Sequence, residues 1–142
     1  MAKKSELESA YRATTYRLML PETDCDLRID VPSVCLAGWM CRKEFDTFSL
    51  LTAYNPASRL CSELENIERQ RALLADVEQA GCMFVTGRNE ADLEGWPVEL
   101  SVCVFDLSLA EACGLGLKYG QNAWLGGGRD GVPHLYWIKE IL

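Results

Sequence analysis

Three serines, each followed three residues later by a glutamate, divide this chain into helical and extended parts. The pairs are Ser5/Glu8, Ser62/Glu65 and Ser108/Glu111. In each pair the serine oxygen can accept a hydrogen bond from a free N–H of the first helical turn, and the glutamate can reach back to the serine N–H. We therefore predict helices over residues 6–14, 63–79 and 109–119, with Gly81 ending the second.

The segments between these helices have the composition of β-strands. Alternating polarity, short apolar runs and β-branched or aromatic residues predict strands over residues 15–20, 26–31, 45–54, 82–86 and 99–105. Residues 122–125 and 134–138 predict a final hairpin around a glycine-rich loop. We expect a turn at 21–24, a loop at 87–97, and either a loop or a short helix at 32–44.

The order of these elements, α-β-β-β-α-β-β-α-β-β, predicts the fold class. Several strands follow one another directly, so we expect an α/β (α+β) fold with a mixed sheet of six to seven strands and three main helices. A chain of 142 residues has the usual length of one domain. We therefore interpret residues 1–142 as a single domain.

The net charge and the cysteine content limit the kinds of partner and the cellular compartment that we expect for this protein. A net charge of −7 argues against binding nucleic acid. No apolar run approaches the ~20 residues that span a bilayer, and none follows Lys3 and Lys4 as in a secretion signal. The seven cysteines are odd in number and lack a C-x-x-C pair, so we expect free thiols, with Cys82 and Cys103 in the core. This predicts a reducing, cytoplasmic location and no membrane association.

The segment 63–79 has an unusual apolar stripe. At ~100° per residue, Leu73 and Val77 define the core side of this helix, and Asn66 and Gln70 fall within the same sector with Arg69 at its edge. A buried amide is unfavourable unless it finds hydrogen-bond partners. Two interpretations stay open: a structural network that ties the preceding turn to the helix, or groups that meet a ligand.

The same region carries a resemblance to a known family. The matching residues are Thr52 to Pro56, Ser58, Ser62 to Asn66, Arg69 and Leu73, then Trp96-Pro97, Glu99 and Ser101, then Tyr119 to Ala123, with Ala10 to Tyr16 near the start. This pattern resembles the bacterial family called domain of unknown function 3293. The resemblance implies no activity, but it suggests that the polar turn, Glu99 and Gln121-Asn122 belong to one recurrent pattern.

Together these observations predict a cleft at the ends of the central strands. Its predicted ligand-binding residues are Tyr54, Asn55, Ser58, Asn66, Arg69, Trp96, Glu99, Gln121 and Asn122. Amides with a single guanidinium suit a small polar or anionic ligand, with Arg69 as the anion anchor. We expect no metal and no cofactor, because no carboxylate–histidine spacing suggests either.

Other function classes have less support in the sequence. Catalysis is undersupported, because the lone histidine, His134, has no evident partner and no serine or cysteine lies in a nucleophile motif. If the protein is an enzyme, Glu99 is the expected acid or base. The alternative from another class is an acidic module that interacts with or inhibits a protein partner.

Overall fold

The computed structural model describes residues 3–142, so the first two residues of the predicted domain lie outside the described part. Seven strands form one sheet in the order β2-β1-β4-β5-β3-β6-β7. The helices and strands have these bounds: α1 Lys4–Arg12, β1 Thr14–Met19, β2 Asp24–Leu27, α2 Val34–Lys43, β3 Phe48–Leu51, the 3-10 turn η1 Pro56–Ser58, α3 Glu63–Gln79, β4 Phe84–Ala91, β5 Glu99–Phe105, α4 Leu109–Lys118, β6 Ala123–Gly127, β7 His134–Trp137 and α5 Ile138–Ile141.

The fold class predicted from the sequence is confirmed as α+β. Every strand pairing in the sheet is antiparallel, where a mixed sheet was expected. The helices α3 and α4 join strands that run in the same direction but do not pair, because β5 lies between β3 and β4, and β3 lies between β5 and β6. The helices therefore do not act as crossovers between parallel neighbours.

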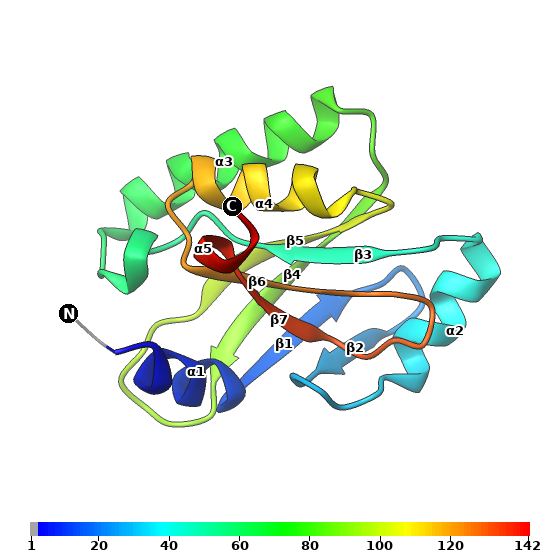
Figure 1. The fold of residues 1–142 in the computed structure, drawn as a ribbon, viewed down its shortest axis with the longest axis horizontal. Helices are drawn as coiled ribbons and strands as arrows, with labels where there is room; N and C mark the ends of the chain where they lie inside the picture. The colour runs from blue at the N-terminus through cyan, green and yellow to red at the C-terminus, as the bar shows by residue number, and fades with distance from the viewer. Residues whose placement is uncertain (1–2) are drawn as a thin grey trace.

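The sheet separates two hydrophobic cores (Figure 1). Successive residues of β5 point to opposite faces, so Val102 and Val104 pack toward α3, α4 and α5, whereas Cys103 and Phe105 pack toward α2. We call these the outer and the inner face. In Figure 1 α3 and α4 lie together on the outer side, and α1 lies apart from them, beyond the other side of the sheet.

The sheet curls so that its two edges meet. Asp30 N, after β2, donates to Pro133 O, just before β7, at 2.7 Å, and Ser33 N donates to Gly131 O at 2.9 Å. These bonds satisfy backbone groups that an open edge would leave to water. The curl makes the inner face concave and leaves room over one end of it.

Most helix predictions are confirmed, and one start signal is wrong. Ser62 and Ser108 each accept a hydrogen bond from the N–H three residues later, and α3 spans the predicted residues 63–79. The helix α1 begins at Lys4, so Ser5 lies inside it and caps nothing. The earlier start follows from tertiary contacts, because Lys4 Nζ bonds Glu140 at 2.6 Å and lies over the Trp137 ring.

Residues 32–44, which the sequence left as a loop or a short helix, form α2. Ser33 caps its start by accepting from Leu36 N, and Leu36, Trp39 and Met40 are buried against the inner face. The hydrophobic pattern of this segment shows no clear helical period, because Gly38 and the charged residues at its end interrupt the apolar stripe. Packing of one apolar face therefore decides this helix.

Several strand boundaries differ from the predictions. The strand predicted at 26–31 ends at Leu27, because the chain then turns through Asp30, whose φ is 63°. The loop predicted at 87–97 is wrong up to Ala91, since β4 continues through Gly87. A Cβ at Gly87 would lie 2.5 Å from Arg17 O, so this glycine allows close strand approach rather than a loop. The last strand ends at Trp137, and α5 follows where strand was expected at Ile138.

The prediction of seven free thiols is wrong for two of them. Cys25 in β2 and Cys35 in α2 form a disulfide, with their Cα atoms 5.9 Å apart. The fold brings them together although ten residues separate them, and no C-x-x-C spacing signals the pair. Cys103 is buried as expected, whereas Cys82 is only partly buried. The argument from free thiols to a reducing compartment thereby loses its premise.

Within residues 3–142, no helix combines the length and apolar character needed to cross a membrane.

Candidate functional site

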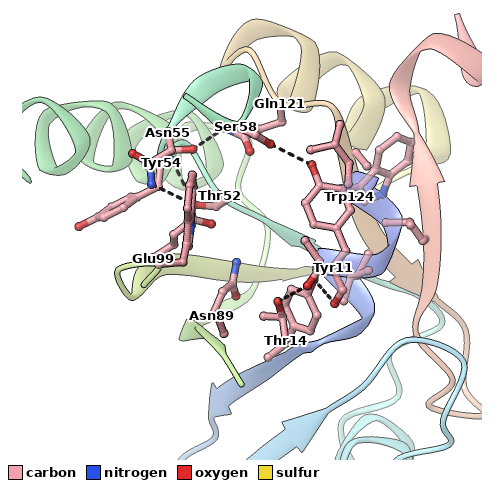
Figure 2. Close-up of a pocket in the computed structure, with 18 of the residues that line it drawn as sticks. Tyr11, Thr14, Thr52, Tyr54, Asn55, Ser58, Asn89, Glu99, Gln121 and Trp124 are labelled. Carbon is pink, nitrogen blue, oxygen red and sulfur yellow. Dashed lines mark hydrogen bonds between the residues drawn. The ribbon is translucent and has the colours of Figure 1, made fainter. Parts of the chain in front are cut away.

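A cavity of about 360 Å³ opens over one end of the inner face, beneath α1 (Figure 2). Its walls come from α1, from the six neighbouring strands β1, β4, β5, β3, β6 and β7, and from the turn after β3. The lining residues that carry the argument are Tyr11, Tyr54, Asn55, Asn89, Trp96 and Glu99. Its volume falls at the lower end of the range for small-molecule sites.

The turn after β3 builds the polar wall of the cavity. Asn55 is buried and takes a left-handed conformation with φ 45°, which asparagine tolerates better than most residues. Its Nδ2 donates to Glu99 Oε2 at 2.7 Å, and its Oδ1 accepts from Cys61 N and Asn66 Nδ2 at 3.0 and 2.9 Å. All polar atoms of the side chain are thus bonded, and Asn55 holds Glu99 in place.

Glu99 is the charged group at the centre of this wall. Its Oε2 also accepts from Trp96 Nε1 at 3.2 Å, so both hydrogen bonds fall on one oxygen. No hydrogen bond to Glu99 Oε1 occurs within residues 3–142. Burial raises the pKa of the Glu99 carboxyl, and the hydrogen bonds from Asn55 and Trp96 oppose that rise in pKa.

Asn89 lies directly opposite Glu99 in the antiparallel pair of β4 and β5. Figure 2 shows both side chains at the same wall of the cavity. Asn89 Oδ1 is buried and has no hydrogen-bond partner among the described residues. A buried amide oxygen without a donor is uncommon in folded proteins and requires an explanation.

Hydroxyl and amide groups join α1 to the opposite wall. Tyr11 OH lies 3.3 Å from Ser58 Oγ, and Asn122 Nδ2 donates to Ser58 Oγ at 3.2 Å. Tyr16 OH donates to Tyr11 O at 3.0 Å, which fixes the end of α1 against β1. The helix has no fully buried residue, so these bonds and its edge contacts hold it over the cavity.

The cluster predicted on α3 lies outside the cavity. Asn66 and Gln70 are buried as predicted, at 2 and 3% exposure, but Asn66 Oδ1 accepts from Asn55 N and Gln70 Oε1 accepts from Ala53 N. Arg69 donates to the carbonyls of Ala53 and Tyr119. Its guanidinium therefore holds the backbone, which favours the structural-network interpretation for α3. Gln70 Nε2 alone stays buried and unpaired here.

The structure thus divides the predicted ligand-binding residues into two sets. The cavity is lined by Tyr54, Asn55, Ser58, Trp96, Glu99 and Gln121. The residues that do not line it are Asn66, Arg69 and Asn122. Asn122 supports the wall through Ser58, whereas Arg69 lines a shallow groove on the other side of the molecule, beside Glu65 and Asp76.

Comparison with known proteins gives a family. The family model described as "Protein of unknown function (DUF3293)" matches residues 51–124, more than half of the chain. The chain belongs to this family. No curated protein and no solved structure matches the chain significantly.

The residues matched by the DUF3293 model include the polar wall of the cavity but not α1, the helix that lies over it. It runs from the end of β3 into β6 and includes Asn55, Asn89, Glu99 and Gln121. The helix α1, with Tyr11, lies before the matched residues. In this DUF3293 protein, segments inside and outside the matched residues therefore build one cavity.

Sequence reasoning missed several lining residues of this DUF3293 protein. Asn89 was placed in a loop, and Tyr11, Thr14, Tyr16 and Trp124 were not assigned to the site. Asn89 could have been found from its alternation with Gly87 and Ala91, which places all three on one face of an extended strand. The aromatic residues give no such signal, because the core and the cavity wall use the same kinds of side chain.

Within residues 3–142, no group of three His, Cys, Asp or Glu side chains is placed to hold a metal ion.

Proposed function

We propose that this protein binds a small polar molecule in the cavity beneath α1. The observation that carries the proposal is the pair of acceptors on its wall, Asn89 Oδ1 and Glu99 Oε1, which the described residues leave without donors. A ligand that donates hydrogen bonds would satisfy Glu99 Oε1 directly, and Asn89 Oδ1 once the Asn89 side chain turns toward the cavity. Most of the remaining wall is apolar or aromatic, as in most small-molecule sites.

The charges at the cavity favour a polar or cationic ligand over an anionic one. The charged residues among its described lining are Glu6 and Glu99, both acidic. Arg69, the expected anion anchor, instead bonds backbone carbonyls outside the cavity. An anion placed next to the Glu99 carboxylate would be repelled in this partly desolvated site.

Filling the cavity tests the proposal. Ala91 lies on the same face as Asn89 and lines the cavity, so Ala91→Trp should occupy much of its volume. Ala72→Trp is the matched control, because Ala72 is exposed on α3 and lines the shallow groove on the other side. We expect compounds from a panel of amines, nucleosides, sugars and carboxylates to bind the wild type and Ala72→Trp but not Ala91→Trp, measured by ligand-observed NMR. Equal binding by both variants, or no binder in the panel, would contradict the proposal.

The alternative function is that of an acidic module that binds a protein partner. It predicts a different result for Ala91→Trp and Ala72→Trp. Partner binding through the acidic surface should weaken with salt and stay unchanged when the cavity is filled. The cavity and its unpaired acceptors favour the small molecule.

A further inference from the structure

The chemistry of the cavity wall also indicates which class of molecule would bind there. This inference rests on the proposed function. Asn89 and Glu99 face each other across β4 and β5, so their side chains start about 5 Å apart. Glu99 Oε1 is the acceptor that a donor in the cavity can reach directly, whereas Asn89 Oδ1 beside it is buried and becomes accessible only when the Asn89 side chain turns.

The acceptor pair has no compensating positive charge. No Lys or Arg is among the described residues that line the cavity, whereas Glu6 and Glu99 both line it. The Arg69 guanidinium on α3 is bonded to backbone carbonyls. Burial also raises the pKa of Glu99, as expected for a carboxylate that lacks a cation. The site therefore lacks one positive charge that a ligand could supply.

The rest of the wall suits the body of such a ligand. Tyr11, Tyr16, Tyr54, Trp96 and Trp124 line the cavity together with several leucines. Trp96 donates its indole N–H to Glu99 and keeps 39% of its surface exposed, so its ring lies beside the carboxylate at the mouth. Aromatic faces near a carboxylate are a recurrent way to bind an organic cation.

We propose that the ligand is a small organic amine, protonated at neutral pH, whose ammonium N–H groups bond Glu99 Oε1 and, once the Asn89 side chain turns toward the cavity, Asn89 Oδ1. Its apolar or aromatic body packs against the aromatic wall. A cavity of about 360 Å³ admits a body of roughly one aromatic ring with a short chain.

Three probes with one body and different head groups test this proposal: 2-phenylethylamine, 2-phenylethanol and 3-phenylpropionate. Binding at pH 7 is measured by calorimetry and by two-dimensional NMR of the full chain. We expect the amine to shift the Asn89 side-chain amide and the Trp96 indole signals, and to bind about tenfold more tightly than either other probe. The alcohol measures the contribution of the body alone.

Matched variants assign the selectivity to the acceptor pair. Glu99→Gln should weaken amine binding about tenfold and abolish the preference over the alcohol. Glu94→Gln removes the same charge from an exposed position between β4 and β5 and should leave amine binding unchanged. If Glu99→Gln fails to fold, Asn89→Ala serves instead, with an expected loss of a few-fold in amine affinity.

The outcomes separate this inference from the proposed function. If the alcohol or 3-phenylpropionate binds the cavity as tightly as the amine, or if Glu99→Gln binds the amine normally, the ligand class is wrong while small-molecule binding stands. If none of the three probes shifts the signals of the cavity wall, this inference and the proposed function both fail.

Discussion

Two polar clusters lie on either side of the turn after β3, and they differ in how their atoms are used. On α3, Asn66 and Arg69 direct their polar groups at the turn and the backbone around it. In the cavity, Asn89 and Glu99 each keep an acceptor that no described residue satisfies. Both clusters contain an amide and a charged group, yet only the second one lines the cavity beneath α1.

The difference shows that burial of a polar side chain does not by itself indicate a binding site. Asn66 is almost fully buried, and its hydrogen bonds stabilise the fold of the turn. Asn89 is less buried, but its oxygen lacks a donor. An unsatisfied acceptor at a cavity is therefore a more specific sign of a ligand than burial alone, because most buried polar groups find a partner within the chain.

The largest effect should follow loss of the α3 amide. Asn66→Ala leaves Asn55 N without its buried acceptor and removes one of the two donors to Asn55 Oδ1, and we expect the free energy of unfolding to fall by about 3 kcal/mol. Urea unfolding followed by circular dichroism measures the change. Glu68→Ala, exposed on the same helix, is the control and should change stability by less than about 0.5 kcal/mol. A small loss for Asn66→Ala would mean that the turn does not depend on α3.

The guanidinium on α3 should behave as a structural group too. Arg69→Ala removes the donors to the Ala53 and Tyr119 carbonyls, and we expect a loss of about 2 kcal/mol in stability. Arg71→Ala removes the same side chain at an exposed position of α3 and should be nearly neutral. If Arg69→Ala instead kept full stability and lost ligand binding, Arg69 would belong with the cavity cluster.

The cavity amide should have the opposite character. Asn89→Ala removes an oxygen that has no partner, so we expect the free energy of unfolding to fall by less than about 1 kcal/mol, well below the Asn66→Ala effect. The same urea titration gives both values. A loss as large as that of Asn66→Ala would show that Asn89 has a structural partner and would remove the contrast between the clusters.

The smallest effect is a pH dependence from Glu99. Burial raises its pKa in the folded protein, so the folded state binds this proton more tightly than the unfolded state. Its stabilising contribution is therefore present below the unfolded carboxyl pKa of about 4 and is lost as pH rises through the raised folded value. Relative to Glu99→Gln, the wild type should lose stability over this interval. Parallel stability curves for the two proteins would contradict the assigned burial of the carboxyl.

Local signals in the sequence predicted the elements whose stability is local. The α3 span, its cap at Ser62 and the strand 99–105 match the structure, because capping and short-range polarity depend only on neighbouring residues. The helix α2 could not be chosen over a loop, since its formation depends on packing against the inner face. The disulfide could not be predicted either, because the pairing of Cys25 and Cys35 requires β2 and α2 to be in place.

The sequence alone determined that Asn66, Gln70 and Arg69 lie toward the core side of a helix, because helical periodicity follows from covalent geometry. The family resemblance suggested in addition that Asn55 and Glu99 belong to one polar pattern, and the structure joins them by a hydrogen bond. Only the tertiary structure decided which polar atoms are satisfied. Hydrogen-bond partners such as the Ala53 backbone, and the lack of a donor to Asn89 Oδ1 among the described residues, depend on segments far apart in the chain. Satisfaction of donors and acceptors is a property of the whole fold.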